Sequence, residues 1–317
     1  MKKEKFQEIR PATLEDYVGQ KELIKQLNIY IDSAKMRNEC LDHILFSGGA
    51  GLGKTTLSQA IANSFGSKIV LANAANMLKP KDVVSYLVTL EEGDFFFIDE
   101  IHRLKKEIEE VLYTAMEDFR IDILVDSGSE TKPISLDIPK FTLIGATTMK
   151  GKISNPLIER FGIDQELREY TNEELVLIIN RTAKIYNIEI SEKASFELAK
   201  RSRGTPRRAN KILKRIIDFA YVKQIDFIEK DFLVDILEKE LCINENGLEE
   251  KDIKILKTLY YDFENRAVGA KNLASALNEN IETLEYTIEP FLIKNKLIVR
   301  TSRGRKITKK GIEIIKE

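Results

Sequence analysis

The fold is decided by residues 44–55, which read Ile44-Leu-Phe-Ser-Gly-Gly-Ala-Gly-Leu-Gly-Lys54-Thr55. This stretch fits the phosphate-loop pattern G-x-x-x-x-G-K-[ST], placed between an apolar strand and a helix start. Glycines let backbone N–H groups surround phosphate oxygens, and the positive end of the helix dipole adds to this. We therefore expect Lys54 to reach the β- and γ-phosphates of ATP, and Thr55 to ligate Mg²⁺. The loop residues expected to bind nucleotide are Gly48, Gly51, Leu52, Gly53, Lys54, Thr55 and Thr56.

A second motif lies 45 residues after Lys54, where the apolar run 95–98 ends in Asp99 and Glu100. In phosphate-loop proteins the first carboxylate helps to hold Mg²⁺, and an adjacent one can polarise the attacking water. An Asp-Glu pair at this place indicates hydrolysis of ATP rather than transfer to a small acceptor. The alternative, two charges at an exposed strand end, is disfavoured by the spacing from Lys54.

Residues 41–170 read as strands alternating with helical segments. The expected strands are short and apolar on both faces, which is typical of a parallel sheet with helices on both faces. They are Ile44–Ser47, Ile69–Asn73, 94–98 and 142–146. Two further strands, 121–125 and 134–138, are joined by a polar tract. They predict a β-hairpin inserted at residues 121–138.

After Tyr170 the pattern changes to helices alone. The expected helices are 172–186, 191–202, 206–223 and 229–240, followed by 248–263, 270–277 and 281–295, with strands at 296–300 and 306–308. Three helices followed by a β-hairpin are typical of a winged helix. We therefore predict three domains: an α/β ATPase domain (1–170), a small all-helical lid (171–242) and a DNA-binding winged helix (243–317).

Composition excludes several classes of protein. The chain is 43% hydrophobic with a formal net charge of −1, so it can bury real cores and lacks the signature of disorder. Its longest apolar runs fall far short of the ~18 residues of a membrane span, and the N-terminus does not resemble a signal peptide, so we expect a soluble, cytoplasmic protein. The two cysteines and two histidines form no metal-ligand cluster, which argues against zinc. We expect His43 and His102 to have structural rather than catalytic roles.

The small net charge hides two basic windows. Residues 200–215 contain eight basic and no acidic residues, and residues 291–317 contain nine basic and two acidic ones. In the first window we expect Arg207 to face phosphate and the others to face solvent or a neighbouring subunit. In the second, Arg300, Arg303 and Arg305 lie around a turn and suit the backbone or minor groove of duplex DNA. The alternative for the second window is a basic, solubilising tail.

Several further motifs carry a resemblance to a known family. They are Arg10-Pro-Ala-Thr-Leu-Glu-Asp-Tyr-Val-Gly19-Gln20, Asp99-Glu-Ile-His-Arg103, Ala115-Met-Glu-Asp-Phe119, Phe141-Thr-Leu-Ile-Gly-Ala-Thr-Thr148, Glu159-Arg-Phe-Gly162, Arg203-Gly-Thr-Pro-Arg207 and Arg300-Thr-Ser-Arg-Gly-Arg305. Together they make the chain resemble the AAA+ ATPases and, within these, the RuvB family of motors that migrate Holliday junctions. The resemblance covers nearly the whole chain.

The resemblance implies a role for each matching position. It makes Arg160 an arginine finger inserted into the neighbouring subunit's ATP site, a group that stabilises charge on the transferring phosphoryl. It makes Arg207 the second sensor of phosphate, and Thr147 the first, with Thr148 as the second choice. The remaining implied nucleotide contacts are Ile9 and Arg10 beside adenine, Tyr170 at the domain junction, and Glu117, Asp118 and Phe119 at the subunit interface near the bound nucleotide.

The resemblance also implies partners. It predicts a homo-hexameric ring on duplex DNA at a Holliday junction, with RuvA docked on hairpin 121–138 and RuvC as a further partner. The implied activity is ATP-driven branch migration in recombination and DNA repair. The alternatives are a clamp-loader-like or initiator switch, a non-motor ATP-dependent DNA scaffold and, least favoured, a small-molecule kinase.

Overall fold

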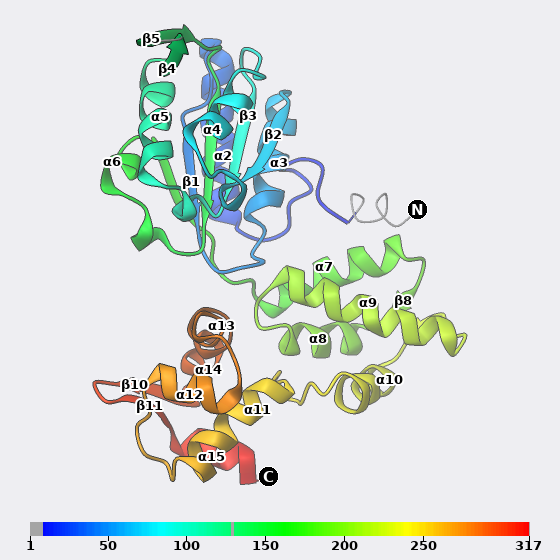
Figure 1. Ribbon diagram of the computed structural model, residues 1–317. Coiled ribbons are helices and arrows are strands. Elements are labelled where there is room, and N and C mark those ends of the chain that lie inside the picture. The colour runs from blue at the N-terminus through cyan, green and yellow to red at the C-terminus, as the bar shows by residue number, and fades with distance from the viewer. Residues whose placement is uncertain (1–8, 128–129, 317) are drawn as a thin grey trace. The chain divides into compact units, whose positions relative to one another are not determined.

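The computed structural model describes residues 9–127 and 130–316, which form two compact units (Figure 1). The first unit runs to Ile185 and also contains Thr205–Arg207. The second contains Tyr186–Gly204 and the chain from Arg208 onward. The boundaries of the three expected domains remain predictions.

The first unit is built on a sheet of five parallel strands in the order β2-β3-β6-β1-β7. Its strands are β1 (Ile44–Ser47), β2 (Ile69–Asn73), β3 (Phe95–Asp99), β6 (Thr142–Thr147) and β7 (Ile163–Glu166). Because neighbouring parallel strands need crossover connections, helices separate them along the chain. The parallel α/β fold expected from the sequence is confirmed. Strand β7 was not predicted, because only Ile163 among its four residues is apolar.

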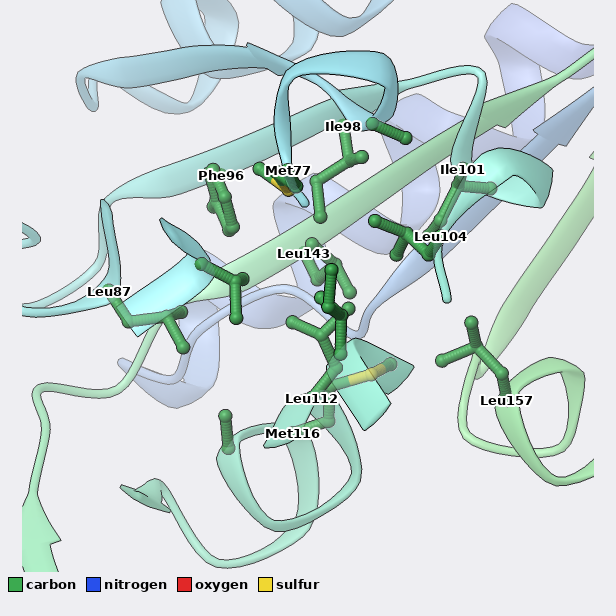
Figure 2. Packing of buried hydrophobic residues seen from close by; sticks show 14 of the residues in the cluster. Met77, Leu87, Phe96, Ile98, Ile101, Leu104, Leu112, Met116, Leu143 and Leu157 are labelled. Carbon is green, nitrogen blue, oxygen red and sulfur yellow. The ribbon is translucent and has the colours of Figure 1, made fainter. Parts of the chain in front are cut away.

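Helices cover both faces of this sheet. They are α2 (Lys21–Arg37), α3 (Lys54–Phe65), α4 (Pro80–Leu87), α5 (Lys106–Glu117) and α6 (Asn155–Ile158), with short turns η1 (Ala74–Asn76), η2 (Ile101–Arg103) and η3 (Lys150–Lys152). Helix α7 (Asn172–Ile185) follows β7 and is the last element of the first unit. On one face, Phe96 and Leu143 of the sheet pack with Leu87 of α4 and Leu112 of α5 in a single buried cluster (Figure 2). On the other face Phe95 meets Phe65 of α3 edge-on at 5.5 Å between ring centroids.

An antiparallel hairpin is inserted in the chain between the sheet strands β3 and β6, as the sequence predicted. It consists of β4 (Arg120–Ser127) and β5 (Glu130–Asp137), with Arg120 paired to Asp137 and Ile121 to Leu136. The tip, residues 128–129, lies outside the described residues. Over residues 9–127 and 130–316, no helix is long and apolar enough to cross a membrane.

The second unit holds two groups of elements. The first group is α8 (Glu192–Arg201), α9 (Pro206–Val222), α10 (Lys230–Asp235) and η4 (Ile236–Glu240), with a two-residue parallel pair β8 (Glu189–Ile190) and β9 (Phe227–Ile228). The second is α11 (Glu250–Lys257), η5 (Thr258–Asp262), α12 (Ala270–Leu277), α13 (Ile281–Thr283), η6 (Leu284–Ile288), α14 (Glu289–Lys294), β10 (Ile298–Thr301), β11 (Gly304–Ile307) and α15 (Lys309–Lys316). This second group is the expected winged helix, with its own core around Leu256, Leu273 and Leu292. The pair β8–β9 and helix α15 were not predicted.

Candidate ATP site and trans-acting arginine

The phosphate loop, residues 48–53, connects β1 to α3. Three of its glycines have φ between 80° and 137°, a region that favours glycine. A Cβ on Gly48 would lie 2.7 Å from the carbonyl oxygen of Leu167, so no larger residue fits there. The Lys54 Nζ donates hydrogen bonds to the carbonyls of Gly48 (2.7 Å) and Gly49 (3.0 Å). No side chain caps α3 at its N-terminus, so its first N–H groups suit a phosphate.

Charged side chains converge beyond this loop. Burial lowers the pKa of Lys54, against the opposing effect of Glu100 and Asp99. Burial, followed by repulsion from Glu100, raises the pKa of Asp99. Both pKa shifts arise because Lys54 and Asp99 are partly removed from water, and the two groups lie close to each other. Carboxylate and hydroxyl oxygens are the ligands that Mg²⁺ prefers, so the chemistry of Asp99 and Thr55 fits the metal.

Glu100 has a strained backbone that directs its carboxylate beyond the end of β3. Its φ is +52°, which is unusual for a residue with a side chain. Its Oε2 accepts a hydrogen bond from Thr148 Oγ1 at 3.0 Å and lies 3.2 Å from His102 Nδ1. Thr148 and His102, which lie on two other segments, thus hold the carboxylate of Glu100 in place. That arrangement suits a base that must face a water molecule.

The structure distinguishes the two neighbouring threonines. Thr147 is fully buried, and its Oγ1 accepts a hydrogen bond from the Met149 N–H and lies 2.9 Å from His102 Nδ1. Thr148 is half-buried and contacts Glu100. The structure therefore favours Thr148, the second choice from the sequence, as the sensor of γ-phosphate. Thr147 instead positions His102.

His102 lies beside Thr147 and Glu100, and we assign it a structural role. Burial lowers its pKa, so the ring is neutral near pH 7. Its Nδ1 lies between Thr147 and Glu100, which fixes the ring. His43 is structural, as expected: its Nδ1 accepts a hydrogen bond from the Leu143 N–H, and its Nε2 lies 3.1 Å from the Met116 carbonyl oxygen.

Two tyrosines link the loop to distant parts of the first unit. Tyr170 is buried and its hydroxyl donates to Tyr17 Oη at 3.1 Å, which in turn donates to the Gly53 carbonyl at 3.4 Å. Burial raises the pKa of both hydroxyls, so both stay protonated. The ring of Tyr170 also lies where a Cβ on Gly19 would be, at 2.6 Å. Tyr17 was not predicted from the sequence, because only the fold brings it beside Tyr170.

The N-terminal segment runs beside α3 in the same unit. The guanidinium of Arg10 donates to Gln59 Oε1 at 3.1 Å, and its carbonyl accepts from Arg181 at 3.2 Å. Ile9 is half-buried next to it. These contacts hold Arg10 beside α3, and the expected contact of Ile9 and Arg10 with adenine remains a prediction.

Arg207 lies against the phosphate loop, as the sequence predicted for a phosphate sensor. Its N–H donates to the Gly51 carbonyl at 3.4 Å, and a Cβ on Gly51 would lie 3.0 Å from the Cβ of Arg207. The guanidinium is exposed, and its charge acts on Lys54 and Asp99. A second cation therefore faces the same space as Lys54.

Arg160 lies near the amino ends of the parallel strands, whereas the phosphate loop of its own chain lies at their carboxyl ends. It precedes β7 by three residues, and Ile163 at the start of β7 is in register with Ile44 at the start of β1. The phosphate loop follows the far end of β1, and four strand residues span about 10 Å. Arg160 therefore lies away from the phosphate loop of its own chain. This geometry suits an arginine supplied to a neighbour.

The Arg160 side chain is held by three groups. Its Nη1 donates to the Pro156 carbonyl at 2.7 Å, its Nη2 pairs with Glu117 at 3.2 Å, and its guanidinium lies 4.4 Å from the centre of the Tyr113 ring. Its Nε is buried and has no hydrogen-bond partner among residues 9–127 and 130–316. Glu117 and Asp118 are exposed at the end of α5, while Phe119 packs on Phe141. None of these three has a described contact with its own phosphate loop, so their implied role at a neighbour's nucleotide remains a prediction.

The structure gives the three arginines of the wing different surroundings, and their expected contact with DNA remains a prediction. Arg305 pairs with Glu285 and with Glu289, at 2.7 Å from Nε to Glu289 Oε1. Arg300 also pairs with Glu289, at 2.6 Å, and Glu289 is 0% exposed. These two arginines bind the wing to the preceding helical segment, because a buried carboxylate must be paired. Arg303 is exposed at the turn and remains the clear candidate for DNA.

The first basic window also differs from expectation. Three of its arginines are largely buried and bind the segment that leads into the winged helix. They are Arg201, Arg203 and Arg208. Arg201 donates to the Ile243 carbonyl at 3.0 Å, and Arg203 donates to the Gly247 carbonyl at 2.7 Å. The sequence does not predict this inward arrangement, because the acidic partners Glu238, Glu249 and Asp252 lie about 40 positions further along the chain.

The fold and site define a phosphate-loop ATPase of the AAA+ class. The defining features are the strand order, the phosphate loop, the Asp-Glu pair and Arg207 at the loop. Three family models match the chain: the Holliday junction DNA helicase RuvB P-loop domain over residues 9–167, the RuvB AAA lid domain over 170–241 and the RuvB C-terminal winged helix domain over 245–316. The chain therefore belongs to the RuvB family.

Individual relatives agree with this assignment. A Holliday junction branch migration complex subunit RuvB from Campylobacter hominis is 48% identical over 307 residues, covering 97% of this chain and 90% of that protein. The protein of the same name from Leuconostoc mesenteroides is 46% identical over 303 residues, covering 96% and 86%. The solved structure of the Thermotoga maritima RuvB Holliday junction branch migration motor matches with a TM-score of 0.87 at 42% identity, covering 97% of this chain and 98% of that one.

Proposed function

We propose that this protein is an ATP-hydrolysing motor that drives branch migration of Holliday junctions in recombination and DNA repair. The observation that carries the proposal is the convergence of Lys54, Asp99, Glu100 and Arg207 on the phosphate loop in a chain of the RuvB family. A small-molecule kinase would need neither the winged helix nor an arginine aimed away from its own site.

Hydrolysis follows from the positions of the side chains. Lys54 and Arg207 bring positive charge to the phosphates, where negative charge grows during transfer. Thr55 and Asp99 would hold Mg²⁺, which would neutralise phosphate oxygens. Glu100, fixed by Thr148, accepts a proton from the attacking water.

The site is incomplete within one chain. Arg160 lies at the other edge of the sheet, so we propose that it completes the site of the next subunit, close to that subunit's γ-phosphate. Head-to-tail contacts of this kind close into rings. A homo-hexamer around duplex DNA is the assembly that the family resemblance favours, with hairpin 121–138 docking RuvA and with RuvC as a further partner.

The test is branch migration on a synthetic four-way junction with ATP and Mg²⁺, with and without RuvA. Wild-type protein is expected to split the junction. Glu100→Gln should bind ATP with unchanged affinity and lose hydrolysis by about 10²-fold or more, because the general base is gone. Full ATPase in Glu100→Gln would refute the assigned chemistry. ATP turnover stimulated by DNA without junction splitting would instead favour a loader-like switch.

A further inference from the structure

A cluster of arginines on the lid holds the segment that leads into the winged helix. We define the arginine joint as Arg203 and Arg208 on the lid side, with Gly247, Glu249 and Asp252 on the winged-helix side. Arg203 donates to the Gly247 carbonyl from both Nε (2.9 Å) and Nη2 (2.7 Å), and it also pairs with Asp252. Arg208 pairs with Glu249 and donates to the Gly247 carbonyl at 3.4 Å. All five residues belong to the second compact unit.

The winged-helix side of the joint is itself rigid. Asp252 is 2% exposed and accepts a hydrogen bond from the Glu249 N–H at 2.7 Å, which caps the start of α11. Gly247 has a φ of +69°, and a Cβ there would lie 3.2 Å from the Arg201 carbonyl oxygen. The backbone of the two groups of elements therefore meets closely at Gly247. Charge-assisted hydrogen bonds to such partners favour the observed arrangement of the arginines.

The joint also reaches the core of the winged helix. The guanidinium of Arg203 lies 3.8 Å from the centre of the Phe291 ring. Phe291 packs against the winged-helix core. Arg203 thus connects the lid to the body of the winged helix, beyond the connecting segment.

The residue next to the joint is the one that contacts the phosphate loop. Arg207 lies with the first unit, while Arg208 lies with the second. Both occur in the first turn of α9, where consecutive side chains point about 100° apart. One peptide bond therefore separates a group that faces nucleotide from a group that holds the winged helix.

We propose that Arg208 and Arg203 make the lid and the winged helix move as one body, so that a displacement of Arg207 by nucleotide is passed on to the DNA-binding domain. This inference rests on the proposed function, because it assigns the residues that couple hydrolysis to movement on DNA. Arg208 and Glu249 are positioning residues that touch no substrate. Their loss uncouples the motor without stopping its chemistry.

A double-mutant cycle measures this coupling in the full-length protein. Glutamine replaces each charge, as Arg208→Gln, Glu249→Gln and both together, and keeps an acceptor at the helix cap at position 249. The matched control is Arg215→Gln, which breaks the exposed Arg215–Asp218 pair on the same helix. Each measurement gives junction migration per ATP hydrolysed.

Each single variant at the joint should keep ATPase within about twofold of wild type and lower migration per ATP by about threefold or more, as expected for a coupled pair. The double variant should be no worse than the poorer single variant, and Arg215→Gln should match wild type. Unchanged migration per ATP in both single variants, or losses that multiply in the double variant, would overturn the inference.

A second readout separates this inference from the proposed function. Dyes attached at Val222→Cys and Tyr261→Cys, both exposed, report the distance between lid and winged helix by energy transfer, in a chain whose Cys40 and Cys242 are serine. Wild type should show the same transfer with and without ATP, and Arg208→Gln should show a nucleotide-dependent change. A change in wild type refutes the rigid body. Failure of wild type to migrate junctions refutes only the proposed function, because the energy-transfer result stands by itself.

Discussion

Individual side chains of this protein take their roles from partners far along the chain. Thr147 and Thr148 are chemically identical, yet one is buried against His102 and the other contacts Glu100. Arg300 and Arg303 differ in the same way, since only Arg300 has a buried carboxylate beside it. The chemistry of each residue type could be predicted from sequence, whereas the direction of each side chain depended on packing.

The first prediction concerns the protonation of His43. Its pKa is lowered by burial, and its Nδ1 already accepts the Leu143 N–H, so a second ring proton would break that bond. A histidine whose folded pKa lies below its unfolded value binds fewer protons when folded. Its contribution to the free energy of unfolding is therefore present above about pH 6.5 and is lost as the pH falls below that value.

NMR titration of the two histidines checks this directly. Both ring pKa values are expected below 6.5, since burial also lowers that of His102. The free energy of unfolding should fall between about pH 7 and pH 5, with a shallower slope in His43→Gln. A His43 pKa at or above that of an exposed histidine would contradict the assigned hydrogen bonds.

At the level of elements, the sequence was most informative where an element is rich in apolar residues. Strands 44–47 and 69–73 and helix 270–277 were predicted with the bounds that the structure has. Strand β7 was missed because only Ile163 in it is apolar, and the pair β8–β9 was missed because two residues carry too little periodicity. The candidate ATP site was predictable because its motifs are local, while Tyr17 and the joint at Gly247 depend on contacts between distant segments.

The wing provides a prediction that separates DNA contact from folding. Arg303→Ala should weaken binding to duplex DNA, reduce the salt dependence by about one phosphate contact, and leave the Tm unchanged, because the side chain is exposed. Arg305→Ala should lower the Tm, because it leaves the buried Glu289 with one fewer partner. Salt-dependent binding and thermal unfolding of both variants check this. An unchanged Tm in Arg305→Ala would contradict a structural role.

At the scale of the whole molecule, the separation of Arg160 from the phosphate loop underlies our proposal that each subunit contributes to two ATP sites. Arg160 lies three residues before the start of β7, whereas the loop follows the end of β1, which is paired with β7 in parallel. Hydrolysis should therefore depend on protein concentration, falling when the assembly dissociates. A chain that hydrolysed ATP as a monomer would need a further arginine of its own, in addition to Arg207, at the carboxyl ends of the sheet strands.

Mixing two inactive variants tests this arrangement. Lys54→Ala removes the phosphate-binding cation but keeps the finger, and Arg160→Ala removes the finger but keeps the phosphate loop. Each alone should lose ATPase by about 10³-fold, in line with trans-acting fingers elsewhere. An equal mixture should regain hydrolysis, because about a quarter of the interfaces on average join an intact loop to an intact finger, whereas an arginine acting within its own chain predicts no recovery at any ratio. Mixing Lys54→Ala with Glu100→Gln is the matched control: neither partner then supplies both loop and base, so it should stay inactive and show that recovery reflects the finger and not exchange of subunits alone.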